Sequence, residues 1–182
     1  SRGEVRSQWS HVNDIGPTVL EAVGLPMPDT INGIPQLPMD GVSLLYATDD
    51  VDAADRHTTQ YFEMFGHRGI VHNGWKAVAY HPPGSAFSDD VWELYNLNED
   101  FNETHDLANA HPERLADMQD IWWQEAETNQ VLPLDDRCAP RFAENAERHR
   151  GGRTHYTFWP GMGHLPSEVA PDLRSRSYTI NA

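Results

Sequence analysis

Apolar and polar residues alternate through residues 66–97, which predicts β-strands. An apolar pair at 70–71 precedes Asn73-Gly74, and a largely apolar run at 75–80 follows it. Asn-Gly tolerates the positive φ angles that a two-residue type I′ turn requires, so we expect a β-hairpin here. The pairs that this turn imposes are His72 with Trp75 and Ile70 with Ala77.

The same register sorts the hairpin's side chains onto two faces, because successive residues of a strand point to opposite sides of a sheet. One face receives Ile70, His72, Trp75, Ala77 and Ala79, and the other receives Val71, Lys76, Val78 and Tyr80. Both sets include large apolar groups. We therefore expect both faces of the sheet to be at least partly covered.

Two further strands extend the hairpin into a sheet. Residues 91–97 follow a Pro82-Pro83-Gly84 break and alternate again. Residues 58–65 are rich in β-branched and aromatic side chains, which favour strands. Because a few antiparallel strands are stable only when something packs on them, the sheet needs a cover.

A helix over residues 112–128 supplies that cover. Pro112 suits the first helical position, and Glu113 suits the first turn. Apolar side chains recur every three or four residues, as one face of a helix requires. We expect the following three to lie on one face of the sheet: Leu115, Met118 and Trp122.

A shorter helix is predicted over residues 14–24. Asp14 can cap its first turn, and Gly24 can adopt the left-handed conformation that ends a helix. Its apolar stripe consists of Ile15, Val19, Leu20 and Val23. The proline-rich loop that follows offers little to cover this stripe, so we expect it to be exposed or buried against another copy of the chain.

The order of these elements predicts an α+β fold, in which a small antiparallel sheet of about four strands packs on a helix. Residues 1–57 hold the first helix and a proline-rich linker. Residues 58–130 hold the sheet and its covering helix. Residues 131–182 are punctuated by glycine and proline, and we expect an irregular C-terminal extension there.

Charge and composition exclude several classes of partner. The formal net charge of −15 repels phosphate backbones and anionic lipids, so we expect neither nucleic-acid nor membrane binding. A single cysteine permits no internal disulfide and leaves the compartment open. The chain lacks an initiating methionine and a signal-peptide-like apolar segment, which suggests that it starts inside a longer protein.

The usual signatures of catalytic and metal sites are missing from the sequence. The acidic run at 49–55 departs from the calcium-binding EF-hand pattern, which needs a Gly at its sixth position and a Glu at its twelfth. His149, His155 and His164 lack zinc-ligand spacing and are interpreted as surface residues. We therefore assign no catalytic, cofactor-binding or metal-ligating residue to this chain.

Cys138-Ala139-Pro140-Arg141-Phe142 comes close to a known nucleophile motif. Sulfatases convert the cysteine of C-x-P-x-R into formylglycine, but here Phe stands where the motif needs Arg, and Arg141 comes one residue early. The flanking residues also do not suggest the helix start on which such a nucleophile lies. We interpret Cys138 as an inert or merely exposed thiol.

Several segments together resemble the C-terminal part of bacterial arylsulfatases, in the sulfatase family of the alkaline-phosphatase-like superfamily. Residues 13–24 (NDIGPTVLEAVG) are similar to a helix late in these enzymes. The segments similar to the family's C-terminal sheet, in the family's order, are 62–70, 74–77 and 92–97, followed by Asp100, Glu103 and Asp106-Leu107. The resemblance covers residues 10 to about 130, and residues 156–182 are similar to the extension of the larger members.

The resemblance implies a full-length parent, an arylsulfatase that hydrolyses sulfate esters with formylglycine and calcium. In this family a large α/β domain carries those groups upstream of the helix at 14–24, which belongs to that domain. The present chain would then lack a cofactor, be inactive alone, and have the N-terminal catalytic domain of the same protein as its partner. Its role would be to complete the fold.

Two other functions stay open from the sequence. The first is a stand-alone protein-interaction module that binds a partner through the uncovered stripe at 15–23 and a tryptophan-rich surface. The second is an independent metal or thiol enzyme built on Cys138 and the histidines. The isolated chain can also self-associate through the same stripe.

Overall fold

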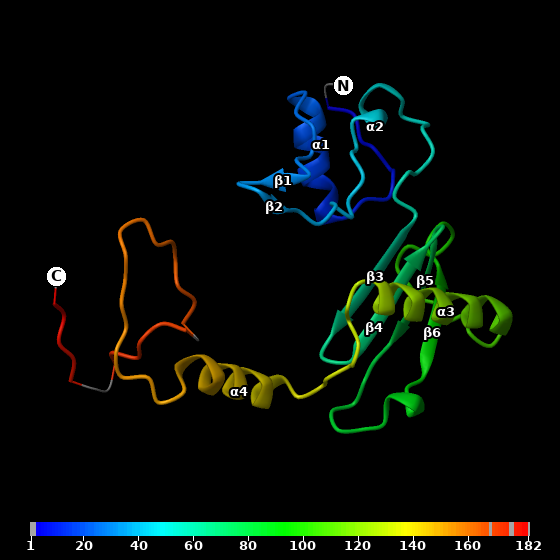
Figure 1. The fold of residues 1–182 in the computed structure, drawn as a ribbon. Helices are drawn as coiled ribbons and strands as arrows, with labels where there is room; N and C mark the ends of the chain where they lie inside the picture. Colours follow the sequence, from blue (N-terminus) through cyan, green and yellow to red (C-terminus); the bar gives the residue numbers. More distant parts are fainter. Residues whose placement is uncertain (1–2, 168, 175–176, 182) are drawn as a thin grey trace.

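The computed structural model describes residues 3–167, 169–174 and 177–181. Figure 1 shows an N-terminal region beside one end of a sheet, the sheet with a helix across it, and an extension that leads away from both. The helical elements are η1 (Val12–Asp14), α1 (Ile15–Ala22), α2 (Tyr46–Asp49), η2 (Phe87–Asp89), α3 (Pro112–Thr128) and α4 (Cys138–Arg150). The strands are β1 (Thr30–Ile31), β2 (Ile34–Pro35), β3 (Thr59–Met64), β4 (His67–His72), β5 (Trp75–Ala79) and β6 (Trp92–Asn96).

The central sheet is antiparallel, with the strand order β3-β4-β5-β6. The hairpin between β4 and β5 has the predicted register, since His72 pairs with Trp75 and Ile70 with Ala77. Asn73 and Gly74 have φ angles of 50° and 78°, as a type I′ turn requires. The predicted α+β fold is confirmed.

The core lies between α3 and one face of this sheet (Figure 1). Its fully buried large side chains are Ile70 and Leu94 from the sheet and Met118 and Trp122 from α3. Leu115 packs at the edge of the same cluster. The prediction that α3 covers one face of the sheet is therefore confirmed.

The other face of the sheet is unevenly covered. Val71 and Tyr95 are buried, but Met64 and Tyr80 are 66% and 69% exposed. The extension touches the molecule near the β3–β4 turn, where the rings of Phe65 and Phe142 lie 6.4 Å apart. The expected partial cover is thus found for Val71 and Tyr95 on this face, and we predict that the extension or an upstream domain meets the rest of it.

Helix α1 ends as predicted but begins differently. Gly24 has a φ of 70°, and the Leu25 N–H donates to the Leu20 carbonyl at 2.9 Å, which closes a Schellman motif. Asp14 precedes the helix, but its side chain does not cap it. The capping prediction is wrong because the Asp14 carboxylate accepts the His11 N–H at the start of η1 and contacts Val42 and His57 from distant parts of the chain.

The extension contains a regular element that the sequence analysis did not predict. Helix α4 spans 13 residues, and Gly151 follows it with a φ of 39° in the left-handed region. Cys138 is the first residue of this helix, so our expectation that no helix starts there is wrong. None of the helices in the described part of the chain combines the length and apolar composition that crossing a bilayer needs.

Candidate functional site

In the sheet region, several polar side chains are buried together around Asp90. Arg68 on β4 forms an ion pair with Asp90 and donates to the Phe87 carbonyl at 3.2 Å. Nδ1 of His81, which follows β5, lies 2.9 Å from Asp90 Oδ2. The side chains of all three are at most 2% exposed. We call these three residues the Asp90 cluster.

Aromatic rings enclose the Asp90 cluster. The Arg68 guanidinium lies 5.1 Å from the centre of the Trp92 ring and 5.7 Å from that of Trp122. The ring of Phe87 stacks on that of His81 at 4.1 Å. Moving the 81–90 loop away from the sheet would separate Asp90 from Arg68 and leave a buried charge unpaired, which is costly. The cluster therefore holds this loop on the sheet. Its buried carboxylate is fully engaged, and we assign it no catalytic step.

A second buried pair joins the N-terminal region to the sheet. His57 Nδ1 lies 2.7 Å from Asp14 Oδ1, and the Asp14 side chain is fully buried. The Asp14 carboxylate also accepts hydrogen bonds from the backbone N–H groups of His11 at 2.7 Å and Val42 at 2.8 Å. One side chain therefore ties α1, the proline-rich loop and the segment before β3 together.

The Asp14 carboxylate is stabilised in its charged form. Burial raises its pKa, but the hydrogen bonds from His11 and Val42 and the contact with His57 outweigh burial, so the pKa of Asp14 lies below its ordinary value of 3.8. A lowered folded-state pKa contributes stability that is fully present above the unfolded-state pKa. That contribution is lost as the pH falls through the folded-state value.

Acidification should therefore weaken the link between α1 and β3. We expect the free energy of unfolding to fall below about pH 4 in the wild type and to fall less steeply in Asp14→Asn. Urea denaturation between pH 2.5 and 6 measures this. Asp52→Asn, in the exposed acidic run, is the matched control and should keep the wild-type slope. Equal slopes for Asp14→Asn and the wild type would contradict the assignment.

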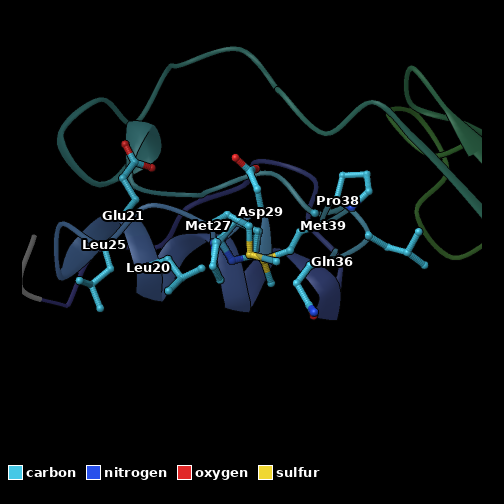
Figure 2. Close-up of a pocket in the computed structure, with 12 residues that line it drawn as sticks. Leu20, Glu21, Leu25, Met27, Asp29, Gln36, Pro38 and Met39 are labelled. Atoms are coloured by element: carbon cyan, nitrogen blue, oxygen red, sulfur yellow. The ribbon is translucent and has the colours of Figure 1, made fainter. Parts of the chain in front are cut away.

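An apolar groove lies between α1 and the loop after it (Figure 2). Its volume is about 620 Å³. Met27 and Met39 lie at its centre, and the carboxylates of Glu21 and Asp29 stand on one side of it. Next to it, the stripe residues Ile15, Val19 and Val23 are 55–61% exposed, whereas Leu20 is half-buried. The expected exposure of the α1 stripe is thus found for three of its four residues.

The residues that the sequence analysis considered as a nucleophile or as metal ligands do not come together in the structure. Cys138 is exposed. His149, His155 and His164 are also exposed and lie along the extension. Among the described residues, no three His, Cys, Asp or Glu side chains converge to hold a metal ion. Cys138 stands at a helix start, but Phe142 still occupies the position at which the formylglycine motif needs Arg, so these residues do not fit that group.

Comparison with known proteins finds a sulfatase that is similar to part of this chain. Over 79 residues, or 43% of its length, the chain is 38% identical to an uncharacterized sulfatase of Schizosaccharomyces pombe. This segment is thus similar in sequence to a sulfatase. The matched segment makes up 14% of the length of that yeast sulfatase, so this chain corresponds to a portion of such a protein. No family model matches the chain.

Two solved structures also match this chain, each over about a quarter of its own length. BT4656, in complex with its substrate D-glucosamine-2-N,6-O-disulfate, is 14% identical with a TM-score of 0.48, over 68% of this chain and 25% of that one. Ps i-CgsB is 21% identical with a TM-score of 0.49, over 70% of this chain and 26% of that one.

Proposed function

We propose that this chain is the C-terminal part of an arylsulfatase, a hydrolase of sulfuric esters, and that it is inactive alone. The observation that carries the proposal is the 38% identity to a sulfatase over a segment that is only 14% of that protein. The formylglycine nucleophile and the calcium ion would lie in the rest of the parent protein. This assignment agrees with the missing catalytic motifs and with the departure at Phe142.

The chain's own role in this proposal is structural. Val19 on α1 and Val23, which directly follows α1, are exposed, and the groove beside them is lined largely by apolar side chains. Exposed apolar surface of this kind is typical of an interface. We propose that the N-terminal catalytic domain covers α1 and that the Asp14–His57 pair fixes α1 to the sheet.

An activity assay of the purified chain tests its proposed inactivity. With an aryl sulfate and calcium, we expect no turnover above the buffer rate, because the chain carries no C-x-P-x-R motif and, among the described residues, no three His, Cys, Asp or Glu side chains converge to hold a metal ion. Cys138→Ser is the control and should also be silent. Clear turnover by the wild-type chain that Cys138→Ser abolishes would contradict the proposal.

The isolated chain should also self-associate through the α1 stripe. Burying the stripe removes apolar surface from water, whereas a lysine there places a charge in the contact. We expect Val19→Lys to shift the chain toward monomer in light scattering coupled to size-exclusion chromatography. Val5→Lys, at a residue that is 84% exposed outside the stripe, should leave the distribution unchanged. A wild-type chain that stays monomeric at all concentrations would contradict this prediction.

A stand-alone interaction module is the second candidate. The same exposed stripe favours it, since any protein with a complementary apolar surface could cover α1. The two candidates differ in what the gene encodes before Ser1. A parent sulfatase requires a long upstream coding region with a C-x-P-x-R motif, whereas a module requires a start codon shortly before Ser1.

A further inference from the structure

His81 lies between two carboxylates. On one side its Nδ1 is 2.9 Å from Asp90 Oδ2, and on the other its Nε2 is 3.5 Å from Asp136 Oδ2. The His81 side chain is fully buried, whereas that of Asp136 is 21% exposed. Asp136 belongs to the segment that connects the sheet region to α4. The ring therefore bridges two parts of the chain that are 55 residues apart.

The contact with Asp136 depends on the protonation of the ring. A carboxylate only accepts hydrogen bonds, so Nδ1 carries the proton that is shared with Asp90. In neutral His81, Nε2 is then a bare acceptor that faces a second carboxylate. Consistent with this, Nε2 makes no hydrogen bond within the described residues. A second proton on Nε2 would convert this contact into a charge-assisted hydrogen bond.

Among the groups around His81, Asp136 is the carboxylate that a second proton, on Nε2, would contact. Arg68 already forms an ion pair with Asp90. His67 Nδ1 accepts the His81 backbone N–H at 3.1 Å. The Ser85 hydroxyl lies 3.5 Å from Nδ1, and the Phe87 ring stacks on the imidazole.

Asp136 stays ionised over the range in which histidines titrate. The Gly84 N–H donates to Asp136 Oδ2 at 2.6 Å, and this hydrogen bond lowers the pKa of the Asp136 carboxyl below its ordinary value. The anionic form of Asp136 is therefore present whether or not His81 carries its second proton.

The segment around Asp136 is tied to α4. Arg137 donates to the neighbouring Asp135 carboxylate at 2.8 and 3.0 Å and to Glu144, in the second turn of α4, at 2.8 Å. Arg141 in the first turn donates to the Asp135 carbonyl at 3.1 Å. The contact of Asp136 with the 82–85 loop is therefore one attachment of α4 to the sheet region, and the contact of Phe142 with Phe65 is a second. Figure 1 shows α4 leading away from the sheet.

We propose that protonation of His81 clamps α4 to the 82–85 loop through Asp136, which makes the attachment of the extension a proton-operated switch. When His81 is neutral, the Gly84 N–H holds the Asp136 carboxylate without a hydrogen bond from the His81 ring. When His81 is protonated, Nε2 donates to the same carboxylate and the attachment tightens. The proposal is independent of any sulfatase activity.

The single cysteine provides a direct test on the full chain. Cys138 is exposed and is the first residue of α4, so a nitroxide spin label on it reports the motion of that helix. Between pH 8 and pH 5 we expect the mobility of the label to fall in the wild type. Asp136→Asn keeps the side-chain size and an oxygen for the Gly84 N–H but removes the charge, and it should lose the pH response.

Glu147→Gln is the matched control, because it removes one negative charge from an exposed position of α4 away from His81. It should keep the wild-type response, and far-UV circular dichroism should show the same helix content in all three proteins. The protection factor of the Gly84 amide, which is its intrinsic exchange rate divided by its observed rate at the same pH, should rise at low pH in the wild type and not in Asp136→Asn. A pH-independent wild-type label, or an equal response in Asp136→Asn, would overturn the proposal.

Discussion

Replacing Trp122 by alanine should lower the free energy of unfolding by about 3–5 kcal/mol, the usual cost of removing a large aromatic side chain from a core. Trp122 is fully buried at the centre of the α3–sheet interface. Its indole N–H donates to the Phe62 carbonyl at 3.1 Å on β3. The substitution removes both the packing and this hydrogen bond, and urea denaturation followed by far-UV circular dichroism measures the loss.

The adjacent tryptophan offers a control of the same size and composition. Trp123 packs against Trp122 with their rings 4.9 Å apart, but it is 40% exposed. We expect Trp123→Ala to cost less than about 1.5 kcal/mol, because a partly exposed side chain loses less burial. Equal losses at the two positions would show that α3 does not pack on the sheet as described.

Replacing Arg68 by methionine should cost about 3–5 kcal/mol, the penalty for leaving one partner of a buried ion pair without the other. Arg68 is 4% exposed, and its partner Asp90 is 1% exposed. Methionine keeps much of the length and the apolar stem of Arg68 but leaves Asp90 with His81 alone. The same urea denaturation measures the change in the free energy of unfolding.

Arg114→Met is the matched control for this substitution. Arg114 lies over the Trp75 ring at 5.2 Å, but its side chain is exposed on α3. We expect a cost below about 1 kcal/mol, as for other exposed cation–aromatic contacts. A loss at Arg68→Met as small as that at Arg114→Met would contradict a buried, paired Asp90.

The parts of the fold that local chemistry determines could be predicted from the sequence. Asn73-Gly74 sets the turn type, and the turn type sets the register of β4 and β5. The spacing of Met118 and Trp122 places both on one face of α3, and this face is the buried one. Both predictions need only neighbours along the chain.

The polar clusters could not be predicted, because their members are far apart in the sequence. Asp90 meets Arg68 across 22 residues, and Asp14 meets His57 across 43. An aspartate before an apolar helix indicates an N-cap, and nothing local reveals that distant partners compete for its carboxylate. The Asp90 cluster was therefore missed entirely.

Helix α4 was missed although a signal was present. Residues 138–150 are rich in alanine, glutamate and arginine, which favour helices, and Gly151 stands at the C′ position. The sequence analysis instead interpreted the glycines and prolines of residues 131–182, among which is Pro140, as marks of an irregular extension. Proline in a first helical turn costs little, because the N–H groups there have no partner within the helix.

The coding sequence that precedes Ser1 tests the central claim, that this chain is the C-terminal part of a sulfatase, most directly. Sequencing several hundred codons upstream should reveal an open reading frame in phase with this chain that contains a C-x-P-x-R motif. An in-frame start codon shortly before Ser1, with no such motif upstream, would contradict the claim and favour the stand-alone interaction module.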